Sequence, residues 1–299
     1  MAGMTNHDES LAQRTRRFLS EADHRPRKSR GQNFLIDPSI AARIADFACD
    51  GEIDGVIEIG AGLGALTEAL AARAPRVVAI EIEPSFVAAL NKVFGDATHV
   101  RIIEADALDA DLSALAESTA PNWSVAGNLP YYAATALIMR ALEVRRPFGR
   151  LVTMVQREVG DRLQAGPGTK AYGILSVAAA YYADSIKAVA RVPRGAFHPH
   201  PNIDSTVVAL TPRRAARDDV WDERLFFAAV KAGFGKRRKM LSNALANAGD
   251  LLDVSRDIAV GAIVDAGIDE QTRAEALGVD EFVLLANRLS EAGVKPVGP

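Results

Sequence analysis

The sequence predicts an α/β fold in which a mostly parallel sheet is flanked by helices and followed by a small all-helical domain. Three observations carry this prediction. Short runs rich in Val and Ile alternate with helix-length amphipathic stretches between residues 55 and 212, a spacing typical of βαβ units. A turn with three glycines follows the first of these runs. Beyond residue 212 the β-rich runs stop, and apolar residues recur only at helical spacing.

The β-rich runs predict seven strands in chain order. They lie at residues 55–60, 76–81, 99–106, 123–128, 150–156, 186–192 and 205–212. The intervening stretches predict helices at 65–74, 84–94 and 133–142, and a longer helix around 172–183. The loop that joins the last two strands is rich in proline and too short for a crossover helix. We therefore expect these two strands to pair antiparallel.

The changes in composition along the chain predict three segments. Residues 1–29 are polar and of mixed charge, and we expect a flexible, basic N-terminal extension. Residues 30–212 hold the sheet. Residues 213–299 form the helical domain, in which the apolar spacing predicts helices within 222–234, 240–249 and 280–293.

The bulk properties exclude several classes of protein. No apolar run reaches the roughly 18 residues that a transmembrane helix needs, and the N-terminal residues lack the apolar core of a signal peptide. Cys49 is the only cysteine, which excludes a disulfide framework and a thiolate metal site. We expect a cytoplasmic protein with no membrane partner.

The distribution of charge favours a polyanionic partner, although the net charge of the chain is −3. The last 50 residues hold ten acids and four bases, so the first 249 residues carry a net charge of +3. The basic residues gather in three clusters, at 25–31, 145–150 and 231–240. One such cluster is often only a solvated face, but three on an otherwise acidic chain indicate a nucleic-acid partner.

The glycines at positions 60, 62 and 64 form the turn between the first strand and the first helix. Glycine lets the backbone approach a ligand closely and exposes the amides of a helix N-terminus. With Ala65 in the last position, the turn fits the Rossmann fingerprint G-x-G-x-x-G/A, and Glu81 fits the ribose-binding acid of that fingerprint. NAD and S-adenosylmethionine both satisfy this pattern.

Three further features favour S-adenosylmethionine. Glu58 lies two residues before the first glycine, where a carboxylate would repel a diphosphate but tolerate an α-amino group and a sulfonium. Asp106, at the end of the third strand, can accept a hydrogen bond from an adenine amine, although it could equally cap the next helix. No residues for hydride transfer are visible, and the fourth strand ends instead in the unusual turn Asn128–Tyr131.

This turn suits methyl transfer to an aromatic amine, a reaction that mainly requires alignment of the reacting atoms. Hydrogen bonds to the side-chain carbonyl of Asn128 and to a main-chain carbonyl near Pro130 would direct the lone pair of the amine at the methyl group. Proline makes the turn rigid, and Tyr131 offers a ring face on which a base can stack. We expect the neighbouring Tyr132 to be an ordinary packing residue.

Taken together, these motifs resemble the ribosomal RNA adenine N6-dimethyltransferases. The resemblance rests first on "RGQNFLID" (30–37), "GAGLG" (60–64) and "NLPY" (128–131). The stretches "GPGTKAYGILSV" (166–177), "AFHPHPNIDSTVV" (196–208) and "FGKRRKMLSNAL" (234–245) resemble the housekeeping members that act on the small ribosomal subunit. One position departs from the family pattern, because Met240 stands where a threonine is usual.

The resemblance implies the Rossmann-like sheet of the S-adenosylmethionine-dependent methyltransferases and assigns roles to individual residues. The resemblance assigns most of the expected cofactor site, and the pattern of the first strand and the glycine loop adds Glu58 and Gly62. The expected site comprises Asn33, Leu35, Glu58, Gly60, Gly62, Glu81, Asp106 and Asn128. The expected catalytic residues are Asn128, Leu129, Pro130, Tyr131 and Phe197, of which Phe197 would be a second aromatic ring beside the target adenine. The expected RNA-binding residues are Arg27, Lys28, Arg30, Lys236, Arg237, Arg238 and Lys239.

The implied reaction adds four methyl groups, two to each of two adjacent adenines near the 3′ end of small-subunit rRNA. The partner would be the pre-30S subunit, with the protein acting as a monomer. Two alternatives remain open: a large-subunit rRNA dimethyltransferase of the antibiotic-resistance type, and an assembly factor whose binding matters more than its catalysis. We expect no metal, because His198 and His200 have no cysteine cluster or carboxylate pair nearby in the sequence.

Overall fold

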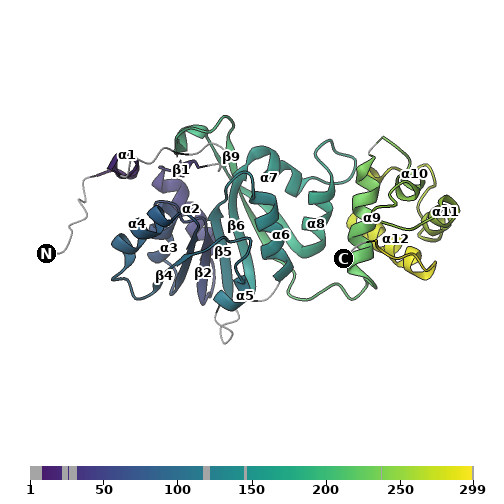
Figure 1. The fold of residues 1–299 in the computed structure, drawn as a ribbon, viewed down its shortest axis with the longest axis horizontal. Coiled ribbons are helices and arrows are strands. Elements are labelled where there is room, and N and C mark those ends of the chain that lie inside the picture. The colour runs from purple at the N-terminus through teal and green to yellow at the C-terminus, as the bar shows by residue number, and fades with distance from the viewer. Residues whose placement is uncertain are drawn as a thin grey trace. The chain divides into compact units, whose positions relative to one another are not determined.

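The part of the chain that the structure describes folds into two compact units, which are treated separately below (Figure 1). The computed structural model describes residues 9–21, 26, 32–116, 122–144, 147–236 and 238–297. The residues up to Gly160 and Ala183–Arg214 form the first unit, and Asp161–Tyr182 and the residues from Ala215 onward form the second. The domain boundary predicted from the sequence lies at residue 212, so that prediction places residues 161–182 in the same domain as the sheet. The predicted division into domains stays a prediction.

A seven-stranded sheet forms the centre of the first unit (Figure 1). The strands lie in the order β4-β3-β2-β5-β6-β9-β7. The five from β4 to β6 run parallel, whereas β9 runs antiparallel to both β6 and β7. The predicted sheet and the antiparallel pairing of the last two strands are thus confirmed. The strands are β2 (Gly55–Ile59), β3 (Val77–Glu81), β4 (Val100–Glu104), β5 (Trp123–Asn128), β6 (Phe148–Gln156), β7 (Ala183–Val192) and β9 (Ser205–Pro212).

Helices α2 (Pro38–Ala48) and α3 (Ala65–Ala71) pack against each other and cover one face of the sheet. Strands β2 and β3 are buried along their whole length, as expected for parallel strands covered on both faces. Helix α2 begins where it does because Asp37 accepts a hydrogen bond from the Ser39 N–H and Pro38 occupies the first turn. The other helices of this unit are α4 (Pro84–Phe94), α5 (Leu112–Leu115), α6 (Ala134–Val144) and the first turn of α7 (Arg157–Gln164).

A second, two-stranded sheet joins two distant parts of the chain. Strands β1 (Phe34–Leu35) and β8 (Phe197–His198) pair antiparallel, with Leu35 opposite Phe197. A 3-10 turn, η2 (Arg194–Ala196), leads into β8.

Residues 11–21 correct the expectation of a flexible extension before residue 30. They form helix α1 (Leu11–Glu21), in which Thr15 and Leu19 are buried. This helix was not predicted, because only a few of its residues are apolar and the rings that bury them belong to other segments of the chain. Leu19 and Phe18 pack with Phe34 and Phe86.

The second unit is helical, with aromatic rings in its core. Tyr181 stacks on Phe226 with ring centroids 4.5 Å apart, and the hydroxyls of Tyr181 and Tyr182 both donate to the carboxylate of Glu223. The prediction of a helical C-terminal region is confirmed, although α11 was not foreseen. The elements are the end of α7, α8 (Ile174–Tyr182), α9 (Glu223–Gly235), α10 (Leu241–Ala246), α11 (Arg256–Asp265), the 3-10 turn η3 (Ala274–Ala276) and α12 (Val279–Glu291).

Within the described ranges, the helices are all too short or too polar to cross a membrane.

Candidate active site

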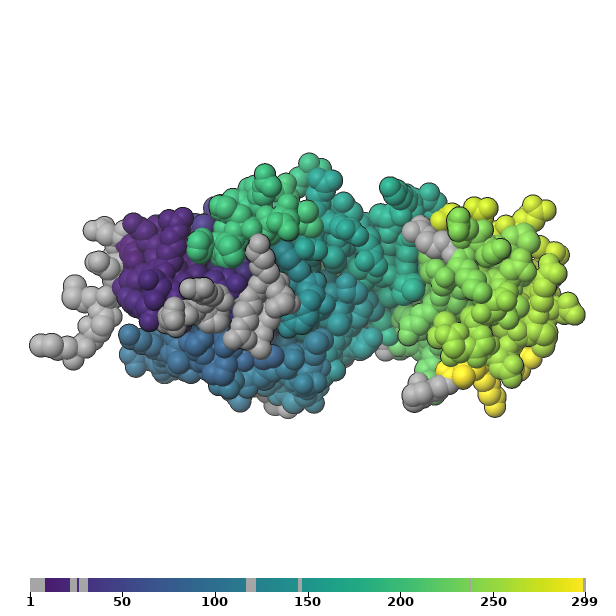
Figure 2. Space-filling view, turned by 45° about the horizontal axis from the view of Figure 1, so that its top comes forward, coloured from purple at the N-terminus to yellow at the C-terminus, as the bar shows by residue number. Residues whose placement is uncertain are grey.

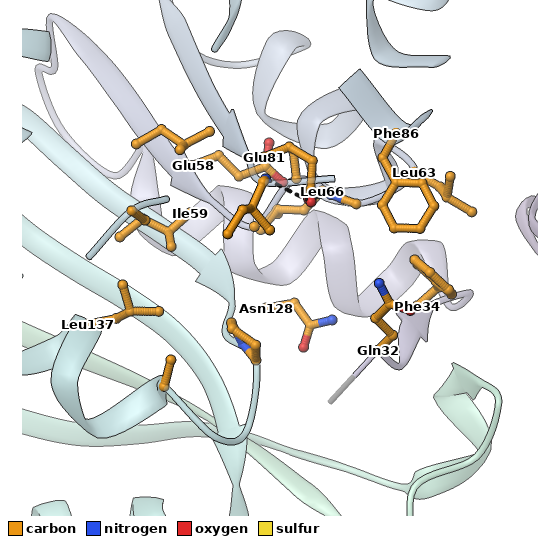
Figure 3. Close-up of a pocket in the computed structure, with 18 of the residues that line it drawn as sticks. Gln32, Phe34, Glu58, Ile59, Leu63, Leu66, Glu81, Phe86, Asn128 and Leu137 are labelled. Carbon is orange, nitrogen blue, oxygen red and sulfur yellow. Dashed lines mark hydrogen bonds between the residues drawn. The ribbon is translucent and has the colours of Figure 1, made fainter. Parts of the chain in front are cut away.

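A pocket opens at the carboxyl ends of β2, β3, β4 and β5 (Figure 3). From β2 the chain runs outward through β3 and β4 and then returns to the other side of β2 with β5. Ligands of open α/β sheets bind at such a switch in strand order. The pocket brings together the whole set of residues that the sequence predicted for a cofactor: Asn33, Leu35, Glu58, Gly60, Gly62, Glu81, Asp106 and Asn128.

The glycine loop after β2 has a conformation that side chains rarely permit. Gly60, Gly62 and Gly64 have φ angles of 76°, 58° and 84°, all in the left-handed region. A Cβ added at Gly62 would lie 3.5 Å from the ring of Phe34, which stands across the loop. The N–H of Gly60 donates to the carbonyl of Ile80 at 2.9 Å, which fastens the loop to β3. The loop therefore forms a cradle beside the pocket, and its left-handed φ angles favour glycine at all three positions.

Glu81, at the end of β3, is 6% exposed, yet both of its carboxylate oxygens are hydrogen-bonded. Oε2 accepts from the N–H of Gly62 at 2.7 Å, and Oε1 accepts from the N–H groups of Ile82 and Glu83 at 2.9 Å. Burial raises the pKa of this carboxyl above its ordinary value, and the three N–H groups act in the opposite direction. Oε2 accepts only one of these bonds and keeps a further lone pair with which it can accept a hydrogen bond from a ligand hydroxyl.

Glu58 is fully buried in β2 and lines the floor of the pocket. Its Oε2 accepts a hydrogen bond of 2.6 Å from the Thr67 hydroxyl. Burial raises the pKa of Glu58 to about 8, against the opposing effect of the Thr67 bond, and the charge of Glu81 raises it further. The carboxyl is therefore mostly protonated at neutral pH. A protonated carboxyl carries no charge, so Glu58 repels a diphosphate less than its sequence position suggested.

Asp106 follows β4 and combines the two roles that the sequence left open. Its Oδ1 accepts from the N–H of Leu108 at 2.9 Å, and its main-chain carbonyl accepts from Asp109 and Ala110, so it stabilises a turn. Helix α5 is capped by a different residue, Asp111. No described residue contacts Oδ2 of Asp106 by a hydrogen bond, which leaves that oxygen available to a ligand.

The turn after β5 presents two unused hydrogen-bond acceptors, one of which belongs to the side chain of Asn128 (Figure 3). Asn128 donates through Nδ2 to the main-chain carbonyl of Asn33 at 3.0 Å, and its Oδ1 has no partner among the described residues. The carbonyl of Pro130 accepts from the N–H of Ala133 at 3.0 Å. The carbonyl of Leu129 bonds to no donor in the described ranges. Asn128 Oδ1 and the carbonyl oxygen of Leu129 are therefore the acceptors that this turn can offer to an amine.

The two tyrosines of the turn have different surroundings from those expected. Tyr131 is half-buried, and its hydroxyl lies 3.1 Å from the Ser205 hydroxyl. Burial raises the pKa of Tyr131 above its ordinary value, and the bond to Ser205 opposes this effect. Tyr132 is 63% exposed and lines the pocket. The expectation that Tyr132 is an ordinary packing residue is therefore wrong, because most of the residue is exposed to solvent.

Phe197 does not offer a second ring to a base in this structure. Its side chain is fully buried and belongs to the main core, together with Leu35, Ile44 and Val207. The pairing of β8 with β1 directs this ring into the core. The expected stacking role of Phe197 is corrected to one of packing, since a ring with no exposed face cannot receive a base.

The predicted RNA-binding residues are only partly described. Lys236, Arg238 and Lys239 are exposed in the connection between α9 and α10. Met240 occupies the N-cap of α10 and makes no side-chain capping bond. The other predicted residues, Arg27, Lys28, Arg30 and Arg237, lie outside the described residues.

One wall of the pocket is apolar, and the sequence did not predict it. Phe34 and Phe86 meet edge to face with ring centroids 5.3 Å apart, and Leu63 and Ile82 line the pocket near them. Ile82 directly follows the ribose-type acid Glu81, a position that could have signalled contact with a ligand. The two phenylalanines gave no such signal, because they lie 52 positions apart in the sequence.

The fold and the pocket define an α/β protein of the methyltransferase class. A dimethyladenosine transferase from Plasmodium falciparum has a similar structure, with a TM-score of 0.71 and 22% sequence identity, over 87% of this chain and 98% of that one. The 23S rRNA methyltransferase ErmE is similar with a TM-score of 0.63 and 23% identity, over 86% and 100% of the two chains. At this level of identity the likeness concerns the fold.

Comparison of sequences is more specific, and the chain belongs to the ribosomal RNA adenine dimethylase family, whose model matches residues 23–291. The chain is 41% identical over 284 residues to ribosomal RNA small subunit methyltransferase A of Alkaliphilus oremlandii, covering 94% of this chain and 98% of the relative. It is 43% identical over 283 residues to the protein of the same name from Moorella thermoacetica, covering 92% and 96%.

Proposed function

We propose that this chain transfers methyl groups from S-adenosylmethionine to N6 of two adjacent adenosines near the 3′ end of small-subunit (16S) rRNA. The product would be a pair of N6,N6-dimethyladenosines. The observation that carries the proposal is that Asn128 and Pro130 line the same pocket as the glycine loop, and that Oδ1 of Asn128 has no partner among the described residues. Membership of the family and the names of the 41–43% identical relatives support small-subunit rRNA as the substrate.

The pocket residues fit the proposed cofactor. The cradle at Gly62 would fill if a side chain were added, and no basic side chain that would hold a diphosphate lines the pocket among the described residues. Glu81 would hold the ribose hydroxyls, and the unused Oδ2 of Asp106 would accept from the adenine amine. When bound, the cofactor supplies a methyl group activated by its sulfonium.

The turn after β5 would orient the target amine. The N6 hydrogens would donate to Asn128 Oδ1 and to the carbonyl oxygen of Leu129, which favours a pyramidal nitrogen with a directed lone pair. An amide and a peptide carbonyl accept hydrogen bonds without taking up a proton, so neither group changes charge during the reaction. Pro130 keeps the turn rigid because its φ angle is fixed. The ring of Tyr131 would stack on the base.

The remaining parts of the proposal concern binding of the subunit. Lys236, Arg238 and Lys239 would contact phosphates, which requires no base-specific geometry. The protein would act as a monomer on the pre-30S subunit in the cytoplasm. Light scattering on the purified protein tests the monomeric state.

The decisive experiment is incubation with labelled S-adenosylmethionine and unmethylated 30S subunits, followed by mass spectrometry of the rRNA. We expect a mass gain of four methyl groups on two adjacent adenosines near the 3′ end of the small-subunit RNA. Label on large-subunit RNA would favour the antibiotic-resistance type of enzyme. Absence of label from both RNAs, with tight binding to subunits, would favour an assembly factor.

A further inference from the structure

Helix α1 lies before residue 23, where the match to the family model begins, yet it packs against the pocket. Figure 2 shows α1 in purple beside the green atoms around β8, in agreement with the contacts between these two elements. The inner face of α1 joins a small apolar cluster, separate from the main core, that contains Phe18, Leu19, Phe34, Leu63 and Phe86.

The rings of this cluster form a chain that leads from α1 into the pocket. Phe18 meets Phe86 edge to face at a centroid distance of 6.0 Å, and Phe86 meets Phe34 in the same way at 5.3 Å. Phe34 and Phe86 line the pocket, whereas Phe18 does not (Figure 3). Phe34 in turn faces the cradle at Gly62. Any influence of Phe18 on a ligand therefore acts through the members of this cluster that line the pocket, namely Phe34, Leu63 and Phe86.

A second contact fixes α1 to the glycine-loop side of the pocket. Arg14 of α1 forms an ion pair with Glu68, in the first turn of α3, at 2.6 Å. Helix α3 begins directly after the glycine loop. Helix α1 thus makes two contacts with the pocket side of this unit: its apolar face packs on Phe34 and Phe86, and Arg14 pairs with Glu68. Both contacts lie next to segments that line the pocket.

We propose that α1 is a structural part of the cofactor site, in which Phe18 is a positioning residue that holds Phe34 and Phe86 against the glycine loop. The inference rests on the proposed use of S-adenosylmethionine. Without the edge-on contact of Phe18, the two pocket rings gain rotational freedom, and the fraction of molecules with a formed wall falls. The apparent Kd of a ligand rises in inverse proportion to that fraction.

The test is isothermal titration of the full chain with S-adenosylhomocysteine and S-adenosylmethionine, for the wild type and for Phe18→Ala. Because an aromatic pair is typically a modest interaction, we expect a rise in Kd of about three- to tenfold. Phe18→Tyr keeps the ring and should bind within about twofold of the wild type. The kcat at saturating cofactor and the KM for 30S subunits should stay unchanged in both variants.

Arg16→Ala is the matched control, since Arg16 is exposed on the same helix and lies outside the aromatic cluster. It should leave the Kd for the cofactor unchanged. A Phe18→Ala protein with a lower Tm but the wild-type Kd would overturn the inference, because α1 would then be only a stabilising element. Failure of the wild type to bind either ligand would instead overturn the proposed function, so the two failures are distinguishable.

Discussion

The side-chain Nδ2 of Asn128 donates to the main-chain carbonyl of Asn33, a residue 95 positions earlier, at 3.0 Å. This bond joins the segment before β1 to the turn after β5, and it fixes which atom of the amide remains for a ligand. Because an amide carries its donor and its acceptor on different atoms, Asn128 can hold the wall of the pocket and a substrate amine together.

Asn128→Ala removes both functions of this amide. We expect kcat for methylation of 30S subunits to fall by about 100-fold or more, as for the loss of one fixed hydrogen-bonding group at a reacting centre. The Kd for S-adenosylhomocysteine should change far less. Single-turnover assays and calorimetry measure the two quantities. Retention of near-wild-type kcat would remove Asn128 from the proposed mechanism, and binding of the variant to subunits provides the control for folding.

Tyr131→Ala removes the ring that we expect to stack on the target base. Stacking contributes about 1–3 kcal/mol per base, which corresponds to a loss of roughly 5- to 150-fold in kcat/KM for the subunit. Tyr131→Phe keeps the ring and loses only the contact with Ser205, so it should retain most of the activity. If cofactor affinity fell as much as kcat/KM in the alanine variant, a stacking role could not be maintained.

Phe197→Ala creates a cavity in the main core, where this ring is fully buried. The free energy of unfolding should fall by about 3–5 kcal/mol. Phe47→Ala, which truncates a ring that is 38% exposed, should cost less than about 1 kcal/mol. Urea denaturation measures both. A stable Phe197→Ala protein that loses only methylation would restore the stacking role that the structure removes.

The buried Glu58 predicts a dependence of stability on pH. Its pKa in the folded protein is raised to about 8, so the folded state favours the protonated carboxyl. The stability from this group is fully present below its ordinary pKa of about 4.5 and is lost as the pH rises through about 8.

Glu58→Gln tests this prediction, because the amide oxygen can still accept the Thr67 hydrogen bond without ionising. The difference in Tm between the wild type and the variant should change progressively between about pH 5 and pH 8, with the wild type losing more. A difference that stays constant over this range would show that folding does not raise the pKa of Glu58.

Met240→Thr should stabilise the helical unit. Met240 is the N-cap of α10 and supplies no side-chain acceptor, and a threonine at such a position typically adds about 1 kcal/mol. Ser255→Ala is the opposite control, because Ser255 caps α11 through a bond from the Ile258 N–H. Thermal unfolding should show a higher Tm than the wild type for Met240→Thr and a lower Tm for Ser255→Ala. A Tm of Met240→Thr equal to that of the wild type would exclude a capping effect at this position.

The sheet and the polar part of the pocket lining were predictable because they depend on local signals. The parallel strands β2, β3 and β4 are short apolar runs bounded by turns, and the residues at their ends follow from the rule that ligands bind at carboxyl ends of parallel strands. Glu81 and Asp106 could therefore be identified from their positions alone.

The orientation of the aromatic rings could not be predicted in the same way. Tyr131 and Tyr132 are adjacent and identical, yet Tyr131 is half-buried with its hydroxyl beside that of Ser205, whereas Tyr132 is 63% exposed. The burial of Phe197 depends on the short pairing of β8 with β1, and two-residue strands leave no periodic pattern. Helix α1 is held by Phe34 and Phe86, whose contribution is invisible in the sequence of the helix itself.

The three hydrogen bonds that Glu81 accepts have a consequence for repeated turnover. Since they are made within the protein, to Gly62, Ile82 and Glu83, the glycine loop acquires its shape when the chain folds. Ordering one residue costs about 1–2 kcal/mol in conformational entropy, and here that loss belongs to folding and not to each binding event. In the proposed reaction the cofactor would be exchanged for each of four transfers, and such preorganisation would lower the cost of every exchange.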